Sequence, residues 1–210
     1  MKKIFSLALA VMMLCLCFTS CGAKTIEAEP FDAEVSVDTT KHTLTKIEMV
    51  IENYGTVSLT LDATVAPITV ENFVSLAERG FFDGLTITRI QQGFVLQGGQ
   101  SDEYLSGIKG EFASNGVEND LLHKKGVISM ARTTEPDSAT SQFFIMLADN
   151  TDLDGDYAAF GWVTSGMNVI EAICADMTSD SYLDDYYYGT LMGFLNDEAM
   201  PIIKTVRIVD

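Results

Sequence analysis

Three side chains that could act together on one ligand lie close together in the chain: the guanidinium of Arg89, the ring of Phe94 and the amide of Gln97. The residues up to position 90 are typical of a short strand, Gly93 marks a turn, and residues 94–97 are typical of a second strand. We therefore expect the three groups to converge, the alternative being that Arg89 is a solvated residue at a sheet edge. Because an arginine stays charged and donates from a rigid fork, such a site could donate a strong hydrogen bond beside an apolar wall.

Other groups that could carry chemistry match known sites poorly. Residues 150–155 imitate the first half of a calcium loop, but the last ligand position would be Gly161 rather than a bidentate glutamate. His42 and His123 are far apart in the chain and have no Cys or His partner nearby, which argues against a zinc site. Ser141 could pair with His123 as nucleophile and base, but no nucleophile-elbow glycines surround it. We expect neither a metal nor a cofactor.

The length and composition favour a single globular domain. The chain has 210 residues, of which 47% are hydrophobic and 20% charged, enough to bury one core. Its formal net charge of −17 argues against nucleic-acid binding, because the phosphates would be repelled. The same charge disfavours binding of an anionic membrane through the protein surface itself.

Residues 1–20 have the composition of a secretory signal peptide. Two lysines precede the apolar run Ile4–Phe18, which is shorter than the roughly 20 residues that a spanning helix needs. The ending Thr19-Ser20-Cys21-Gly22 resembles a bacterial lipoprotein cleavage site, and Cys21 would then be the lipid-modified first residue of the mature chain. The alternatives are an ordinary signal peptide cut near the same place and an uncleaved anchor.

Residues 21–43 are expected to form a lipid-anchored N-terminus and a flexible tether. Carboxylates outnumber lysines in this segment and its apolar residues show no sustained period, which predicts a coil spanning about 25 Å. If Cys21 carries lipid, Cys174 has no disulfide partner, and its apolar helical surroundings predict a small buried hydrophobe rather than a nucleophile. The folded domain is expected to cover residues 44–210.

Within the domain the apolar residues mostly alternate, which predicts β-strands. Residues 47–51 and 57–61 flank the turn Asn53-Tyr54-Gly55 and predict an antiparallel hairpin. Helical spacing predicts helices from Pro67 to about Gly80 and from Met167 to Cys174. Further strands are expected at 86–90, 94–97, 127–130, 143–146, 160–163 and 205–209. The predicted fold is mainly β, a closed eight-stranded antiparallel barrel capped by two α-helices.

Several separate motifs point to one family. They are Gly80-Phe-Phe-Asp-Gly84, Thr88-Arg89-Ile90, Gln92–Gly99, Gly126–Ala131, Ser141–Ile145, Leu153-Asp-Gly155 and Phe160-Gly161. In order and spacing they resemble the cyclophilin-type peptidyl-prolyl isomerases, over about residues 45–178 and again in the last strand. Within that family the chain looks most like exported bacterial members.

The resemblance implies catalysis of rotation about X–Pro peptide bonds. The amide resists rotation by about 18–20 kcal/mol, and the uncatalysed exchange takes tens to hundreds of seconds. No bond has to break. A catalyst needs to hold the proline ring while the acyl half turns, and to donate a hydrogen bond to the imide nitrogen as its lone pair localises.

The resemblance also assigns roles to individual residues. Arg89 matches the catalytic arginine, Gln97 the amide that works with it, and Phe94 part of the proline pocket. The other positions that match substrate-binding residues are Phe144, Leu153, Phe160, Tyr157, Val95, Gln142, Ala131, Arg132 and Asp152.

The chain departs from the family pattern in four places. Ile87-Thr88 replaces a common Phe-His pair, and Gln91-Gln92 replaces an apolar-Pro pair. Both changes lie close to Arg89 and could alter the orientation of its side chain. Asp152 stands at a rim position that carries tryptophan in members sensitive to the cyclic peptide cyclosporin. An acidic, tyrosine-rich insert at about residues 180–200 has no counterpart and is either a decorated surface loop or a partner-binding feature.

The expected function is peptidyl-prolyl isomerisation in the folding of exported proteins, on the outer face of the bacterial cytoplasmic membrane. The expected partners are Pro-containing unfolded or exported polypeptides. Contact with the membrane is expected only through the lipid, and the protein is expected to be a monomer. The alternative is a lipid-tethered module that binds Pro-containing segments without significant turnover.

Overall fold

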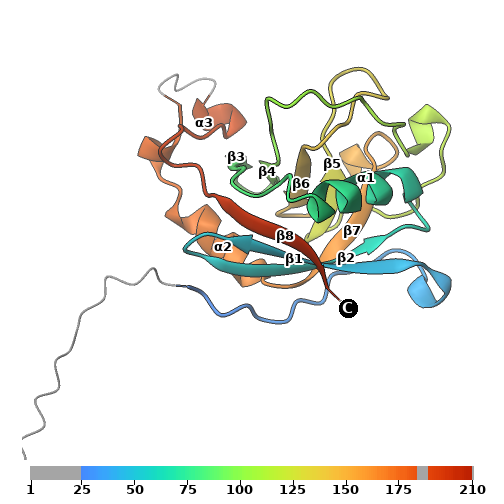
Figure 1. The fold of residues 1–210 in the computed structure, drawn as a ribbon, viewed down its shortest axis with the longest axis horizontal. Helices are drawn as coiled ribbons and strands as arrows, with labels where there is room; N and C mark the ends of the chain where they lie inside the picture. Colours follow the sequence, from blue (N-terminus) through green and yellow to red (C-terminus); the bar gives the residue numbers. More distant parts are fainter. Residues whose placement is uncertain (1–24, 184–188, 210) are drawn as a thin grey trace, which may run out of the picture.

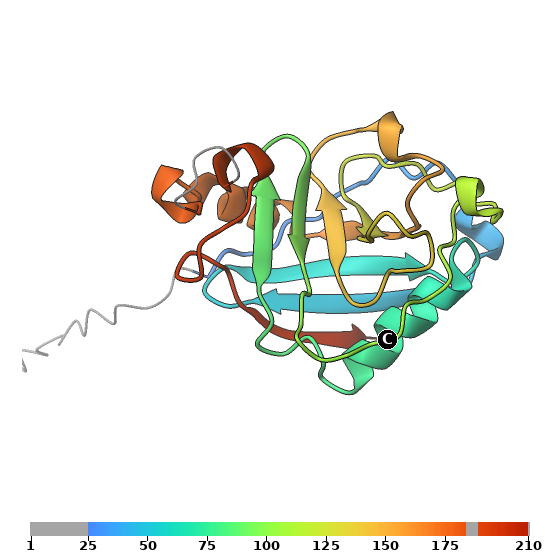
Figure 2. The same cartoon turned by 90° about the horizontal axis from the view of Figure 1, so that it is seen from above.

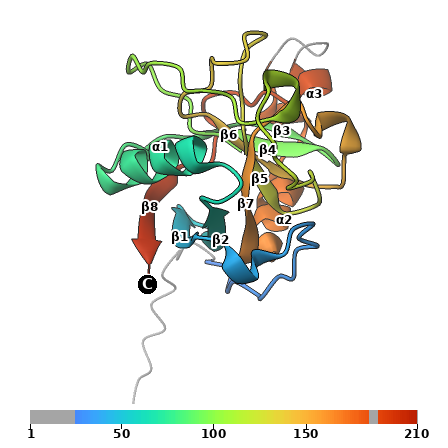
Figure 3. The same cartoon turned by 90° about the vertical axis from the view of Figure 1, so that its right-hand side faces the viewer.

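The computed structural model describes residues 25–183 and 189–209, and the predicted signal peptide and Cys21 lie outside them. Eight strands of the described chain form one antiparallel sheet in the order β3-β4-β6-β5-β7-β2-β1-β8. The sheet curls around a hydrophobic core (Figure 1 and Figure 3). The strands are β1 (Leu44–Ile51), β2 (Gly55–Asp62), β3 (Ile87–Gln91), β4 (Val95–Gly98), β5 (Val127–Met130), β6 (Phe143–Met146), β7 (Ala159–Ser165) and β8 (Ile203–Val209). The α-helices are α1 (Pro67–Glu78), α2 (Met167–Asp176) and the short α3 (Gly189–Met192).

The sheet is an open half-barrel, so the expectation of a closed barrel is wrong. Its two end strands, β3 and β8, do not pair with each other. The Ile87 N–H at the start of β3 donates to the carbonyl of Pro201, which precedes β8, at 2.8 Å, and Ile203 of β8 bonds to residues 84 and 85, which precede β3. Farther along β3, the Ile90 N–H donates to the Gly193 carbonyl at 2.7 Å, and the Thr88 carbonyl accepts from Leu195. Because residues 193–195 use these edge groups, β8 cannot pair along β3.

The β1–β2 hairpin shows how alternation builds the core. Ile47, Met49 and Ile51 are buried on β1, and Met49 pairs with Val57 in register while Ile47 pairs with Leu59. The turn that joins the strands places Asn53 at a φ of 66°, a left-handed conformation that asparagine tolerates. The predicted hairpin is confirmed, and it forms the half of the sheet that lies away from β3 and β4 (Figure 2).

The N-terminus of α1 is capped by a distant carboxylate. Its N-cap residue, Ala66, has no side chain that could accept a hydrogen bond. Glu111, only 2% exposed, instead accepts from the Ile68 N–H at 3.0 Å, the Thr69 N–H at 2.8 Å and the Thr69 hydroxyl at 2.7 Å. A carboxylate here satisfies free helix donors and complements the helix dipole.

Removing this cap should destabilise the protein markedly. We expect Glu111→Ala to lower the free energy of unfolding by about 2–4 kcal/mol, because it leaves several buried donors without an acceptor. Urea unfolding followed by circular dichroism measures the change. The matched control is Glu103→Ala, which removes an exposed carboxylate paired with Arg79 and should cost under about 1 kcal/mol. Equal losses in the two variants would contradict the capping role.

Residues 25–43 lie along the domain, so the expectation of a flexible tether is wrong for this part of the chain. The Ile26 N–H donates to the Tyr54 carbonyl at 2.6 Å, the Phe31 N–H to Thr164 at 2.9 Å, and the Glu29 carbonyl accepts from Gly166 at 2.8 Å. Phe31 packs against the main core, and Ala33, Val35 and Val37 pack against a second cluster around β5 and β6. These residues occupy every second position from 31 to 37, so a period of two directs one face of the segment onto the domain.

None of the helices within residues 25–183 and 189–209 has both the length and the apolar character needed to cross a bilayer.

Candidate active site

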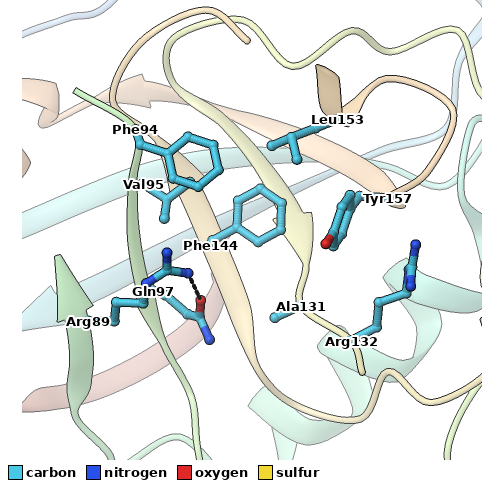
Figure 4. Close-up of a pocket in the computed structure, with 9 residues that line it drawn as sticks. All are labelled: Arg89, Phe94, Val95, Gln97, Ala131, Arg132, Phe144, Leu153 and Tyr157. Carbon is cyan, nitrogen blue, oxygen red and sulfur yellow. Dashed lines mark hydrogen bonds between the residues drawn. The ribbon is translucent and has the colours of Figure 1, made fainter. Parts of the chain in front are cut away.

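A cavity of about 200 Å³ opens between the β3–β4 hairpin, β6 and the loops that follow β5 and precede β7 (Figure 4). Nine residues line it, all of them expected from the sequence: Arg89, Phe94, Val95, Gln97, Ala131, Arg132, Phe144, Leu153 and Tyr157. Arg89, Phe94 and Gln97 of the β3–β4 hairpin therefore do converge. They meet residues as far along the chain as Tyr157, which lies 68 positions after Arg89.

The polar side of the cavity is built around Arg89. Arg89 faces Gln97 across the β3–β4 ladder, and its Nη1 donates to Gln97 Oε1 at 3.3 Å. The amide of Gln97 is fixed in turn, because its Nε2 donates to Gln142 Oε1 at 3.0 Å. Burial lowers the pKa of the Arg89 guanidinium below its ordinary value. Arginine nevertheless remains cationic near neutral pH, and in a partly desolvated site its charge acts strongly.

The rest of the cavity is lined by an apolar wall. Val95 and Phe144 are 2% and 5% exposed, and Phe144 stands directly opposite Gln97 in the β4–β6 ladder. The Phe144 ring meets the Tyr157 ring edge to face, with centroids 5.7 Å apart. Phe94 and Leu153 complete the wall (Figure 4). The pairing of β4 with β6 thus places the cation and the aromatic floor side by side.

A second arginine lies at the far end of the cavity. The Arg132 guanidinium stands 4.7 Å from the centre of the Tyr157 ring, and its Nε donates to the Asp156 carbonyl at 3.0 Å. The neighbouring Ala131 N–H is already bonded to the Gln142 carbonyl at 2.9 Å. Arg132 is therefore held against the loop before β7 rather than directed at Arg89.

Three residues expected at the site do not line the cavity. Phe160 is fully buried in β7, where its ring lies 5.4 Å from the Phe73 ring in the main core, so it is a core residue rather than a wall. Gln142 contacts the cavity only indirectly, because it accepts a hydrogen bond from the cavity-lining Gln97 and so orients that amide. Asp152 is exposed in the 3₁₀ turn Thr151–Leu153, immediately before the cavity-lining Leu153.

A buried polar group behind the wall was not predicted. His123 Nδ1 lies 2.9 Å from Asp154 Oδ1, and His123 Nε2 lies 3.1 Å from the Ser129 hydroxyl. The carboxylate, imidazole and hydroxyl are ordered as in a hydrolase triad, but Ser129 has no exposed surface, so no substrate can reach it. The His123 ring stacks on Phe144 at 6.0 Å and supports the wall from behind. Ser141, the partner considered from the sequence, instead donates to the Gly99 carbonyl.

The His123 group predicts a pH dependence of stability. Burial lowers the pKa of His123, although Asp154 acts in the opposite direction, so the folded protein favours the neutral ring. A group with a lowered histidine pKa loses its stabilising effect as pH falls below the unfolded value of about 6.5. We expect the free energy of unfolding to fall more steeply between about pH 7 and pH 5 in the parent protein than in His123→Asn. Parallel pH profiles from urea unfolding would contradict the prediction.

Within the described residues the potential metal ligands are dispersed, and the free thiol is buried. Among the described residues, no cluster of three or more His, Cys, Asp or Glu side chains is arranged to hold a metal ion. Cys174 is buried, and burial raises its pKa to about 11, so the thiol stays protonated at neutral pH. This is the behaviour expected of a small buried hydrophobe.

Comparison with known proteins identifies relatives of this chain. Residues 46–187 match the profile of the family described as cyclophilin type peptidyl-prolyl cis-trans isomerase/CLD. Peptidyl-prolyl cis-trans isomerase A of Dickeya dadantii is 42% identical over 132 residues, which cover 60% of this chain and 70% of the relative. A peptidyl-prolyl cis-trans isomerase of Acinetobacter baylyi is 40% identical over 138 residues, covering 60% and 71% of the two chains.

The fold has solved counterparts as well. A Cryptosporidium parvum cyclophilin type peptidyl-prolyl cis-trans isomerase superposes with a TM-score of 0.64 at 20% identity, over 80% of this chain and 99% of that one. At this identity the likeness shows the shared fold alone.

Proposed function

Because this chain belongs to the cyclophilin-type peptidyl-prolyl cis-trans isomerase family, we propose that it speeds X–Pro rotation in exported proteins and so assists their folding. The enzyme class follows from the family and from several relatives that carry it. The exported substrates and the place of action are our proposal. The observation that carries the activity is the Arg89 guanidinium fixed beside an apolar cavity, with Gln97 at 3.3 Å.

The cavity suits a single ring better than a large ligand. Its volume of about 200 Å³ lies below the roughly 300–1,000 Å³ typical of sites for drug-sized molecules. Phe94, Phe144 and Leu153 would hold the proline ring while the acyl half of the bond rotates. Ring binding alone does not lower the barrier, because it is equally strong in the ground and transition states.

Arg89 would provide the interaction that is stronger in the transition state. As the bond twists, resonance is lost and the imide nitrogen gains a localised lone pair that can accept a hydrogen bond. Within the described residues, three of the five Arg89 N–H groups have protein partners, at Gln91, Gln97 and Met192, and the other two can donate to a substrate. Lowering the barrier by about 5–7 kcal/mol would raise the rate by about 10⁴–10⁵.

The test is direct measurement of cis–trans exchange in an Ala-Pro peptide by exchange NMR, with the purified full chain at micromolar concentration. We expect acceleration that scales with protein concentration. The alternative, a binding module without turnover, is motivated by the altered residues around Arg89. It would give peptide shift changes on titration but no acceleration, and that result would overturn the proposed activity.

The proposed location is the outer face of the bacterial cytoplasmic membrane, with a lipid on Cys21. Support comes from the signal-like residues 1–20 and from the small residues before Cys21. Cys21 lies four residues before Thr25, which begins the described chain. Because four residues span at most about 14 Å, the docked N-terminal segment would hold the domain closer to the bilayer than a flexible tether would.

Lipidation gives a prediction with matched controls. Cys21→Ser should abolish incorporation of a labelled fatty acid and release the protein from the membrane fraction, because acyl chains rather than the acidic surface supply the affinity. Cys15→Ser and Cys17→Ser change cysteines within the proposed signal, so both should label like the parent. Equal labelling of Cys21→Ser and the parent would contradict the lipoprotein assignment.

A further inference from the structure

The acidic insert is joined to the strand that carries Arg89. It comprises residues 180–200, of which 180–183 and 189–200 are described. Phe194 forms an antiparallel bridge with Arg89 itself, flanked by the Ile90 to Gly193 and Leu195 to Thr88 hydrogen bonds. Leu195 is fully buried in the main core and anchors the pairing. The insert therefore adds backbone to the outer edge of β3, next to the cavity (Figure 2).

Two contacts from the insert reach the Arg89 side chain. The Arg89 Nε donates to the Met192 carbonyl at 2.6 Å, against 2.5 Å for its bond to Gln91 and 3.3 Å for its bond to Gln97. The Phe194 ring centre lies 5.7 Å from the guanidinium carbon, on a par with the 5.9 Å of Phe94 in the cavity. Met192 ends α3, and the Gly193 N–H closes that turn on the Gly189 carbonyl at 2.7 Å, which fixes the direction of the preceding carbonyl.

We propose that the insert is a positioning element for Arg89, in which the Met192 carbonyl and the Phe194 ring hold the guanidinium in its catalytic orientation. The inference rests on the proposed isomerase function and deepens it. It assigns a role in turnover to a segment that the sequence suggested was a decorated loop or a partner-binding feature.

The physical need for such an element follows from the arginine side chain. A free arginine loses much rotamer freedom when it is fixed, and misplacement of a catalytic group by about 1 Å can cost 10²-fold in rate. Acceptors at Met192 and Gln91 engage the guanidinium from outside the cavity, and Gln97 engages it from within. Because the Met192 carbonyl holds Nε, rotation of the Arg89 guanidinium is restricted, and its free Nη protons stay directed at the substrate.

Covering the edge of β3 does not by itself require these contacts. Edge protection is achieved by the backbone bonds of Ile90 and Thr88 alone. The hydrogen bond from a side-chain Nε to the Met192 carbonyl adds nothing to that pairing, but it constrains the one residue on which the chemistry depends. Gln91, one of the departures from the family pattern, belongs to the same arrangement, because its Oε1 accepts from Arg89 Nη2.

Gly193 offers a way to displace the insert without touching the cavity. Its φ is +78°, and a Cβ there would lie 2.6 Å from the Ile90 carbonyl carbon, so Gly193→Ala must push residues 192–194 away from β3. The matched control is Gly116→Ala, at a φ of +77° with open space around the added methyl. Both variants carry similar backbone strain, and Gly193→Ala alone moves the Met192 carbonyl.

In Ala-Pro exchange measured by NMR, we expect Gly193→Ala to lower kcat about 10- to 100-fold, with KM changed less than about 2-fold. Gly116→Ala should match the parent. The Arg89 Nε–H should exchange with water much faster in Gly193→Ala, a signal that a general loss of packing elsewhere would not give. A folded Gly193→Ala protein with the kcat and Nε–H exchange of Gly116→Ala would overturn the inference.

A second pair of variants decides the matter if Gly193→Ala does not fold. Phe194 is 38% exposed, so Phe194→Ala should preserve the fold, and we expect a kcat loss of about 3- to 10-fold. Leu191→Ala, at a side chain 56% exposed in α3, is the control and should leave kcat unchanged. Equal kcat in these two variants would count against the inference. Absence of turnover in the parent protein would instead refute the proposed function.

Discussion

Arg89→Ala should reduce kcat/KM for Ala-Pro exchange by about 100- to 1,000-fold while peptide affinity changes by less than about 3-fold. Loss of one preorganised donor to a developing charge typically costs this much in other enzymes. The wall formed by Phe94, Phe144 and Leu153 is untouched, so the proline ring should still bind. Arg89→Lys should not restore the rate, because an ammonium has three N–H groups and the acceptors at Met192, Gln91 and Gln97 would use all of them, leaving none for the substrate.

Exchange NMR gives the rate, and a peptide titration gives the affinity of the same variant. Arg79→Ala is the control for loss of one positive charge, since Arg79 is exposed and pairs with Glu103. It should retain the parent rate. A rate above about a tenth of the parent in Arg89→Ala, corresponding to a loss of under about 1.4 kcal/mol, would rule out this mechanism.

The side-chain part of the site could be predicted because spacing in a hairpin fixes which groups face each other. A tight turn at Gly93 brings Arg89 opposite Gln97, and the neighbouring strand β6 adds Phe144 beside them. The Met192 carbonyl could not be predicted in this way. It lies 103 residues from Arg89 in sequence and acts through its backbone, which has no residue-type signature.

Two features of the fold were predicted wrongly from the sequence, for different reasons. The docking of residues 31–37 was signalled by apolar residues at every second position, but the surrounding carboxylates obscured that short pattern. The lack of pairing between β3 and β8 has no counterpart in the sequence pattern. Strand periodicity cannot show that residues 193–195, and not β8, occupy the outer edge of β3.

His123 illustrates a further limit of sequence reasoning. The sequence offers His123 as a base for Ser141, although no nucleophile-elbow glycines surround that serine. The actual neighbours of His123 are Ser129 and Asp154, which come from β5 and from the loop before β7. Pairing of β5 with β6 and β7 brings them together, and full burial then makes the group a support for Phe144 rather than a nucleophile.

The second large effect is expected on inhibition by cyclosporin, an apolar cyclic peptide that inhibits many cyclophilins. Asp152 is exposed beside the cavity-lining Leu153, which places it at the rim, where sensitive members carry tryptophan. A carboxylate offers no N–H donor, a loss of about 0.5–1.5 kcal/mol, and would be partly desolvated under an apolar ligand. The missing ring contact adds about 1–2.5 kcal/mol for about 50–100 Å² of buried area. We expect affinity about 10- to 1,000-fold weaker than in a tryptophan-bearing member.

Asp152→Trp tests this expectation in the chain itself, because the side chain is exposed and the substitution should not disturb the core. It should raise cyclosporin affinity about 10-fold or more, measured by inhibition of Ala-Pro exchange, while uninhibited turnover of a short peptide stays within about 2-fold. Asp32→Trp, an equivalent change at an exposed position of the N-terminal segment, controls for added aromatic surface and lost charge and should leave inhibition unaltered. Tight inhibition of the parent, or an equal gain in both variants, would show that the Asp152 rim does not control binding of the drug.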